Sequence, residues 1–342
     1  MTSRWRQIVH AMQLLRLEVV FPAISNGWLV VFLAWQNEPG TTGQHTPGFQ
    51  SLEIALLLTL IVAGGLAIYG IALNDVLDVR HDRTFSPSRP IPIGAIGPIS
   101  AVILGILCLL AAVLASVFLG VGSAVLCVLT AITILFFNLT GKFLPAVGIV
   151  LVGLVRALNM FIPFPWIAFA WPIWLTMTHV MACYAIVHVL EGKRPRLRDA
   201  DWWAICAGWI FWTLTLVTWM NWRYHGSPGA MHGRPWMWIG PMIVVAIFVC
   251  IAWLMLRHRM RPIRIRRATG AAFMRFAMLW LIVYDAVWLI SRELYGPGLL
   301  LMFFFLLAYG VVQLGETLRR FSESSTKYHV TSPHQPIQIS RL

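Results

Sequence analysis

Long apolar stretches, separated by short polar segments, recur along the first 320 residues of the chain. Most are long enough to form a transmembrane helix, which needs roughly 20 apolar residues to cross a bilayer core about 30 Å thick. The pattern predicts ten such helices, near residues 14–35, 52–78, 99–120, 122–139, 145–162, 166–190, 202–222, 236–256, 270–291 and 298–318. The predicted fold class is therefore all-α, a polytopic membrane helical bundle.

The composition agrees with this interpretation. Of the 342 residues, 59% are hydrophobic and only 11% are charged, and the mean hydropathy is +0.76. A soluble domain has a larger charged share and a smaller apolar share. We expect an integral, multi-pass protein of a bacterial inner membrane.

The formal net charge of +13 would also suit a nucleic-acid-binding protein. The placement of the basic residues distinguishes this class from a membrane protein. They gather before the first predicted helix and then in alternate loops, at 80–89, 142, 193–198 and 257–267. This positive-inside pattern predicts that both termini are cytoplasmic. Because arginine-rich loops also attract anionic lipid head groups, we expect membrane lipids as partners and no nucleic acid.

We predict one transmembrane domain over residues 1–320, because no internal repeat divides it. The tail at residues 321–342 is polar and contains Pro, Ser and His. Such a composition is typical of disorder, so this segment is predicted to be a disordered cytoplasmic tail.

The most informative segment is residues 74–96, NDVLDVRHDRTFSPSRPIPIGAI, at the end of the second predicted helix. At about 100° per residue, Asn74, Asp75, Asp78 and Asp82 lie within an arc of roughly 100° on one helical face. Carboxylates so arranged repel one another unless a cation lies between them. Mg²⁺ suits such a site, because it binds carboxylate oxygens and keeps water and substrate phosphates as its other ligands. The segment therefore predicts an Mg²⁺ site that binds a diphosphate.

The alternative for these acids is a solvated helix end, where they would form ion pairs with Arg80, Arg83 and Arg89. Acidic residues at the edge of a membrane are functional more often than not. The stretch NDVLDVRHD also resembles the NDxxDxxxD motif of the UbiA superfamily of intramembrane prenyltransferases, and SRPIPIG resembles its RPxPxG continuation. Two adjoining matches are more specific than one. The resemblance implies a bundle of nine transmembrane helices, so we expect about nine to ten.

A weaker similarity to the family extends along most of the chain. Phe137, Asn138 and Lys142 resemble the family's Tyr and Lys after the fourth helix, with a phenylalanine in place of the tyrosine. Arg16 and Asn26 resemble polar positions that line the family's pocket. Asn26 would equally suit a hydrogen bond to a neighbouring helix.

The family's second aspartate motif, DxxxD, should follow the sixth helix, but the chain reads YAIVHVLEGKRPRLRDADWW there. His188 and Glu191 share one face of this helix end. We expect Glu191, with or without His188, to replace the missing acids, and Lys193 and Arg194 to bind the diphosphate as cations. The alternative is that Glu191 simply pairs with one of these cations. The short Glu-Gly element is similar to the EboC-like branch of the superfamily, whose second motif is also degenerate.

The resemblance implies Mg²⁺-dependent transfer of a prenyl group from a polyprenyl diphosphate to an acceptor that the sequence does not identify. The predicted site comprises the catalytic residues Asp75, Asp78, Asp82 and Lys142, the diphosphate-binding residues Asn74, Arg89, His188, Glu191, Lys193 and Arg194, the pocket residues Asn26, Arg156 and Asn159, and the metal ligands Asp75, Asp78, Asp82 and Glu191. Arg156 is expected to pair with Asp285, which lies at a similar depth, or to share a polar cluster with Asp285 and Asn159. The alternative is that Arg156 lines the far end of the pocket.

Two other functions remain open at this stage. A catalytically inactive UbiA-like protein would serve as a lipid-binding or scaffold subunit, which the degenerate second motif allows. A membrane transporter would also combine many helices with a few buried charges. The predicted site residues gather on the cytoplasmic side, however, which suits a closed pocket better than a conduit.

Overall fold

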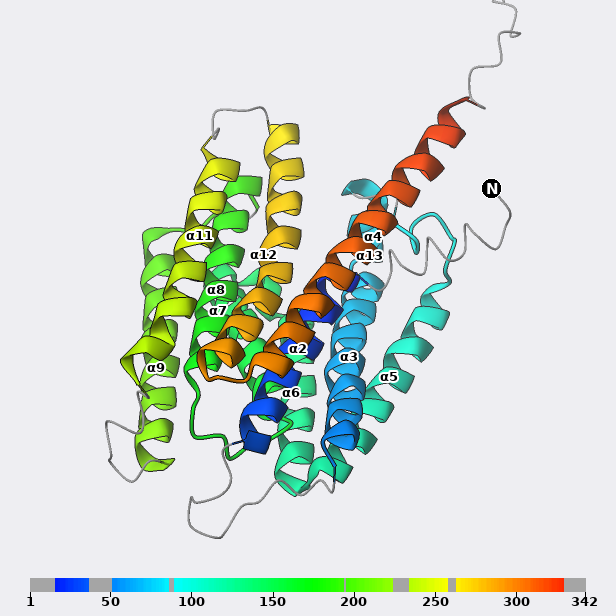
Figure 1. The fold of residues 1–342 in the computed structure, drawn as a ribbon. Helices are drawn as coiled ribbons and strands as arrows, with labels where there is room; N and C mark the ends of the chain where they lie inside the picture. Colours follow the sequence, from blue (N-terminus) through cyan, green and yellow to red (C-terminus); the bar gives the residue numbers. More distant parts are fainter. Residues whose placement is uncertain are drawn as a thin grey trace, which may run out of the picture.

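The computed structural model describes residues 16–36, 51–85, 89–193, 195–223, 234–257 and 263–328. Within these ranges the chain is helical (Figure 1). The elements are α2 (Leu17–Gln36), α3 (Leu52–Leu77), α4 (Val79–Phe85), α5 (Pro98–Leu119), α6 (Val121–Leu139), η1 (Gly141–Phe143), α7 (Pro145–Phe161), α8 (Trp171–Glu191), α9 (Asp199–Arg223), η2 (Pro235–Trp238), α11 (Ile239–Leu256), α12 (Ile263–Ser291) and α13 (Tyr295–Tyr328). Arg194 lies outside the described residues.

The described helices confirm the prediction of an all-α membrane bundle. Nine of them are long and apolar enough to cross a bilayer, and α7, an apolar helix of 17 residues, is a shorter tenth. They follow the ten predicted apolar stretches closely, because each stretch ends in the polar or Gly/Pro-containing segments that end the helices. Helix α13 continues to Tyr328, past the boundary predicted at residue 320. The chain is an integral, multi-pass membrane protein.

The inner and outer helices of the bundle differ in how much of their surface is buried. Helices α2 and α12 are the most buried and pack against each other, whereas α5, α9, α11 and α13 expose most of their apolar surface. Ile99 on α5, for example, is 77% exposed. Such residues match the acyl chains of a bilayer, so the exposed apolar surface indicates lipid contact.

Small residues allow α3 and α5 to pack closely, as is common between membrane helices. A Cβ atom at Gly65 on α3 would lie 2.6 Å from the carbonyl oxygen of Cys108 on α5. Gly105 on α5 faces Ala72 on α3 in the same way, with 3.3 Å between a Cβ built there and the Ala72 Cβ. This contact holds the half of α3 that leads to its polar end, and hence the direction in which that end points.

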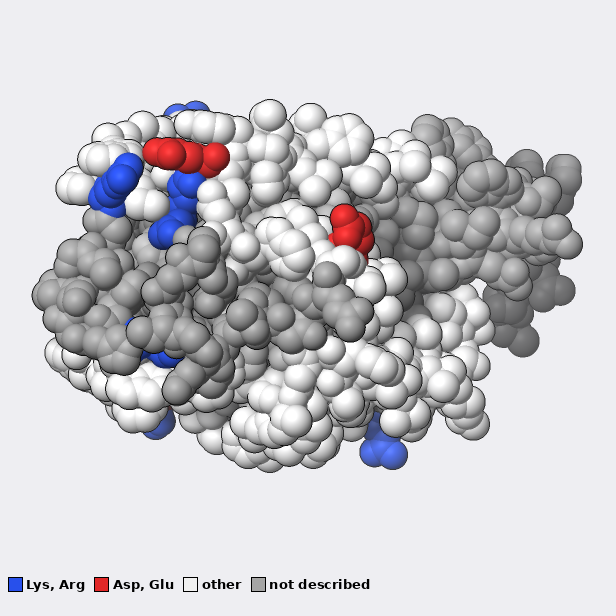
Figure 2. All heavy atoms as spheres, turned by 60° about the horizontal axis from the view of Figure 1, so that its bottom comes forward, with Lys and Arg blue, Asp and Glu red and all other residues white. Residues whose placement is uncertain are grey.

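The two ends of the bundle carry different chemistry. Helices α3, α8 and α11 end at the upper end of the bundle in Figure 1, where α4 also lies. Helices α5, α9 and α12 begin at the same end. The segments rich in arginine and lysine therefore meet at this end, which we call the α4 end. Figure 2 is turned to bring the opposite end forward, and its described surface shows few charged side chains.

A buried polar contact joins α2 to α12 inside the bundle. Asp285 on α12 is 1% exposed and accepts a hydrogen bond from Ser25 Oγ at 2.7 Å. Its two carboxylate oxygens also accept from Asn26 Nδ2, at 3.0 and 2.9 Å. A carboxylate within a membrane helix requires such partners, because lipid supplies none. Asn26 thus bonds a neighbouring helix, which was one of the two interpretations of its role.

We predict that Asp285→Ala lowers the free energy of unfolding by about 1–3 kcal/mol, because it leaves the buried Ser25 hydroxyl and Asn26 amide without their partner. Unfolding in mixed detergent micelles measures the change. Ile99→Ala, which removes a side chain that faces lipid, serves as the control and should have a much smaller effect. Equal stability of the two variants would contradict the role assigned to Asp285.

Candidate active site

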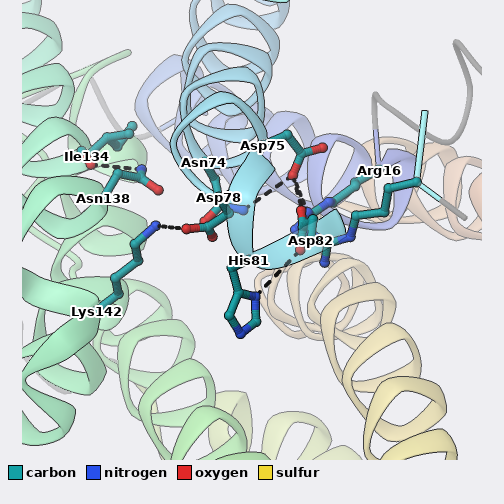
Figure 3. Close-up of polar contacts among 10 residues, drawn as sticks. Arg16, Asn74, Asp75, Asp78, His81, Asp82, Ile134, Asn138 and Lys142 are labelled. Carbon is teal, nitrogen blue, oxygen red and sulfur yellow. Dashed lines mark hydrogen bonds and ion pairs between the residues drawn. The ribbon is translucent and has the colours of Figure 1, made fainter. Parts of the chain in front are cut away.

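The polar end of α3 is not one continuous helix, because the chain bends at Asp78. Asp78 is the C-cap of α3, with φ −90° and ψ 4°, and its N–H donates to the Asn74 carbonyl at 2.9 Å. The short helix α4 then starts at Val79 and carries Asp82. The single helical face expected from the sequence is therefore broken, and Asp82 approaches Asp75 across the bend (Figure 3).

Each of the three aspartates has a basic partner from another part of the chain. Asp75 forms an ion pair with Arg16, which precedes α2. Lys142 Nζ lies 2.5 Å from Asp78 Oδ1, and Arg89 Nη1 lies 2.5 Å from Asp82 Oδ2. Buried charges need partners of this kind, and Asp75 and Asp82 are both buried.

Arg89 connects two of the aspartates. Its Nη1 atom, 2.5 Å from Asp82, also lies 3.7 Å from Asp75 Oδ1. The alternative prediction was a solvated helix end whose acids pair with Arg80, Arg83 and Arg89. Arg89 does form such ion pairs, so this alternative is partly correct. Asp75 and Asp82 are nevertheless buried rather than solvated, and Asp75 also pairs with Arg16, which is 59 positions away in sequence.

The donor chemistry of this cluster suits Mg²⁺, which binds carboxylate oxygens. In the arrangement that the structure describes, no three His, Cys, Asp or Glu side chains converge closely enough to hold a metal. The Arg89 guanidinium, however, shows that the space between Asp75 and Asp82 accommodates a cation. These two residues, with Asn74 and Asp78 beside them, are the ones that would hold the metal once Arg89 turns away.

Lys142 is positioned by a short helical turn that leans on α7. It belongs to η1, between α6 and α7, and is mostly buried. Gly148 on α7 backs onto this turn: a Cβ atom there would lie 2.8 Å from the Gly141 carbonyl oxygen and 3.5 Å from Lys142 Cα. The absence of a side chain at Gly148 lets the turn approach α7 and present Lys142 to Asp78.

A cavity of about 180 Å³ opens beside this cluster and extends into the bundle. Asn74 and Ala63, both on α3, line it, so it spans about 16 Å along that helix at 1.5 Å per residue. Most of its wall is apolar. The polar residues of the wall are Arg16, Asn74, Thr130, Asn138, Arg156, Asn159 and Tyr184.

The predicted pocket residues take different places. Arg156 and Asn159 on α7 line the cavity, where Arg156 Nη2 donates to the Val19 carbonyl at 3.3 Å and Asn159 Nδ2 donates to the Ala23 carbonyl at 3.1 Å. Among the described contacts, no ion pair joins Arg156 to Asp285, whereas Arg156 does line the cavity, which agrees with the alternative interpretation of Arg156. Asn26 does not line the cavity.

The residues expected to complete the second half of the site lie apart from the aspartates. Glu191 at the end of α8 pairs with Lys193 at 3.1 Å and packs against Gly270 of α12. His188 is half-buried, and its Nε2 lies 2.9 Å from the Pro195 carbonyl oxygen. Among the described contacts, none joins either residue to Asp75, Asp78 or Asp82. The pairing of Glu191 with Lys193 is the alternative that the sequence left open.

Tyr184 is a site residue that the sequence did not reveal. It lies on α8 and lines the cavity. A single tyrosine within an apolar helix carries no pattern that separates it from a packing residue, so only the fold could identify it.

Comparison with known proteins was made on sequence and on structure. No family model matches the chain. Two curated relatives, both named digeranylgeranylglyceryl phosphate synthase, match parts of it. The protein from Sulfurisphaera tokodaii is 30% identical over 142 residues, which cover 42% of this chain and 50% of the relative. The protein from Saccharolobus solfataricus is 32% identical over 130 residues, covering 38% and 45%. The chain thus spans about half the length of the curated relatives it matches.

The fold is shared more widely than this sequence match. A solved structure described as a digeranylgeranylglyceryl phosphate synthase in membranes superposes with a TM-score of 0.53 at 16% sequence identity, covering 84% of this chain and 98% of that one. The solved structure that matches by fold and the two relatives that match by sequence carry the same enzyme name, digeranylgeranylglyceryl phosphate synthase. The chain is thus similar in part of its sequence to the two curated relatives and in fold to this solved structure.

Proposed function

We propose that the protein transfers a prenyl group from a polyprenyl diphosphate to an acceptor within the membrane. One observation carries the proposal: a compact group of three aspartates and three cations lies at the mouth of an apolar cavity. A ligand that fits such a site has a strongly charged head and an apolar body. A prenyl diphosphate has both, and the two curated relatives are named for a prenylated product.

The charges at the mouth suit the release of diphosphate. Mg²⁺ bound there would neutralise negative charge on the diphosphate as it leaves, which is a Lewis-acid role. Lys142 and Arg89 are placed to bind the diphosphate oxygens when they leave Asp78 and Asp82, and arginine does so with two parallel hydrogen bonds. Lys142 and Arg89 would thus neutralise the aspartates when the site is empty and bind the diphosphate when it is filled.

The transfer exchanges one bond for another. The bond between prenyl C1 and the diphosphate oxygen breaks, and its electron pair stays with the diphosphate. A new bond forms between C1 and the nucleophilic atom of the acceptor, whose proton passes to the diphosphate or to water. The apolar wall excludes water from C1 in the meantime, so the prenyl cation is captured by the acceptor rather than hydrolysed.

The orientation follows from the same charges. We infer that the α4 end, with its basic loops, faces the cytoplasm of a bacterial cell, so that both termini are cytoplasmic and the diphosphate reaches the site from that side. Residues 1–320 would form the transferase domain, and the segment that follows would be a cytoplasmic extension.

Incubation of the purified protein with radiolabelled geranyl, farnesyl or geranylgeranyl diphosphate tests the proposal, with and without Mg²⁺ and membrane extract. We expect diphosphate release that depends on Mg²⁺ and is lost in Asp78→Asn. The melting temperature should hardly change, because the ion pair that Asp78 forms with Lys142 is partly exposed and contributes little to stability. Bound prenyl diphosphate without release would favour a lipid-binding or scaffold subunit instead.

Gly148→Ala tests whether Lys142 must be held in place. The added methyl group would push η1 away from α7, because it meets the Gly141 backbone at 2.8 Å. We expect a several-fold loss of affinity for farnesyl diphosphate in the presence of Mg²⁺, measured by equilibrium binding. Gly310→Ala on α13, where a Cβ atom meets nothing within 4 Å, is the matched control. Equal affinities in the two variants would show that the position of η1 is unimportant.

Glu191 remains a proposed part of the diphosphate site, since it lies at the α4 end of α8 and would need only a movement of this helix end to contribute. If it does, Glu191→Gln should weaken the binding of Mg²⁺ or of the prenyl diphosphate without a change in melting temperature. Titration of the variant with each ligand measures this. Affinities equal to those of the wild type would leave Glu191 only its ion pair with Lys193.

A further inference from the structure

We propose that one anionic phospholipid binds in a groove on the outer face of α9, with its phosphate on Arg223 and an acyl chain along the aromatic wall of the groove. The site is separate from the aspartates and from the arginine-rich loops of the α4 end, and it does not depend on the proposed transfer. Two observations carry it: a groove of about 490 Å³ on α9, and a guanidinium group beside that groove whose terminal nitrogens have no described partner.

The groove follows a stripe of side chains along one face of α9. This helix lies at the outside of the bundle (Figure 1), where it packs mainly against α7. The lining residues recur at the spacing of a helical face, and they are Phe211, Leu214, Thr215, Thr218, Trp219 and Trp222. From its first to its last residue the stripe is about 17 Å long at 1.5 Å per residue. This length matches one leaflet of a hydrocarbon core about 30 Å thick, so the groove can hold an acyl chain.

Trp219 gives the groove a fixed wall, because its ring is held on the protein side. The ring stacks on that of Trp166 at a centroid distance of 5.9 Å, and its Nε1 donates to the Ile167 carbonyl at 3.0 Å. The ring of Trp222 lies 5.2 Å from that of Trp219, and Trp222 is 58% exposed. Tryptophan favours the boundary between lipid tails and head groups. The wall therefore combines a fixed ring with one that is open to lipid.

Arg223 is oriented beside this wall. It follows Trp219 by four residues, so the two side chains are neighbours on the helix. Its Nε donates to the Trp166 carbonyl at 3.0 Å, which fixes one edge of the guanidinium plane. In the described part of the chain, no hydrogen bond or ion pair engages its two terminal nitrogens. The edge between Nη1 and Nη2 is therefore available for two parallel hydrogen bonds, which is the geometry that a phosphate accepts.

The length of α9 places Arg223 at the level of lipid head groups. The 25 residues of this helix span about 37 Å at 1.5 Å per residue, more than a hydrocarbon core of about 30 Å. Because Asp199, its first residue, lies at the α4 end, Arg223, its last, reaches the opposite interface. With the α4 end inferred to face the cytoplasm, this interface belongs to the outer leaflet. An anionic lipid there brings a phosphate to the cation, whereas a zwitterionic lipid also brings an ammonium group that repels it.

Photo-crosslinking in phosphatidylcholine nanodiscs tests the site, with a trace of phosphatidylglycerol or of phosphatidylcholine that carries a diazirine on its acyl chain. Crosslinks to residues 211–222 are mapped by mass spectrometry. We expect a yield at least about fivefold higher with the phosphatidylglycerol probe, as a hydrogen bond to a charged group implies. Arg223→Gln should abolish this preference. Arg234→Gln, at the same end of the bundle but with its guanidinium over the Trp236 ring at 5.2 Å, is the matched control and should keep it. Trp222→Ala should lower the phosphatidylglycerol yield and leave a preference.

Several results would overturn the proposal. Equal yields for the two probes in the wild type would show that α9 does not prefer an anionic lipid, and this result needs no variant to fold. A preference that persists in Arg223→Gln would show that this cation does not bind the phosphate. An equal loss in Arg234→Gln would assign the preference to the general charge of this end of the bundle, and unchanged yields in Trp222→Ala would show that the groove does not hold the acyl chain. Failure of the transfer reaction would appear separately, as absent diphosphate release with the lipid preference retained.

Discussion

The burial of acidic side chains at the end of α3 is the constraint on which the site depends. Asp75 and Asp82 are removed from water, so each requires a cation. With Lys142, the partner of the neighbouring Asp78, the cations of the three aspartates come from three separate segments of the chain. Arg16 precedes the first described helix, Arg89 follows α4, and Lys142 joins α6 to α7. The ion pairs thereby gather the α4 end of the bundle around one point. The same charges make this point suitable for a metal and a diphosphate, because both the acids and the bases can exchange partners.

The membrane imposes the second constraint, since polar groups inside the bundle find no water there. Asp285 satisfies it with Ser25 and Asn26, and so joins α2 to α12. Arg156 satisfies it only in part, with one of its nitrogens on a backbone carbonyl.

The sequence predicted the helices well, because an apolar stretch of about 20 residues has few structures available in a bilayer. It also located the aspartates, since their spacing and the adjoining RPIPIG are unusual. It could not foresee the bend at Asp78, which depends on how α4 packs. Nor could it pair residues such as Arg16 with Asp75, 59 positions apart, or Asn26 with Asp285, 259 positions apart. Equal depth along two helices suggested a pair between Arg156 and Asp285, but depth does not determine which helical faces meet.

In the proposed reaction, Mg²⁺ and diphosphate together fill the site formed by the aspartates and their cations. Calorimetric titration with Mg²⁺, with and without the unreactive analogue geranyl S-thiolodiphosphate, tests this most directly. Because Arg89 occupies the space between Asp75 and Asp82 in the empty site, we predict weak Mg²⁺ binding alone and binding about 5–150-fold tighter with the analogue, as a coupling of about 1–3 kcal/mol implies. Mg²⁺ affinity that is unaffected by the analogue would contradict the account.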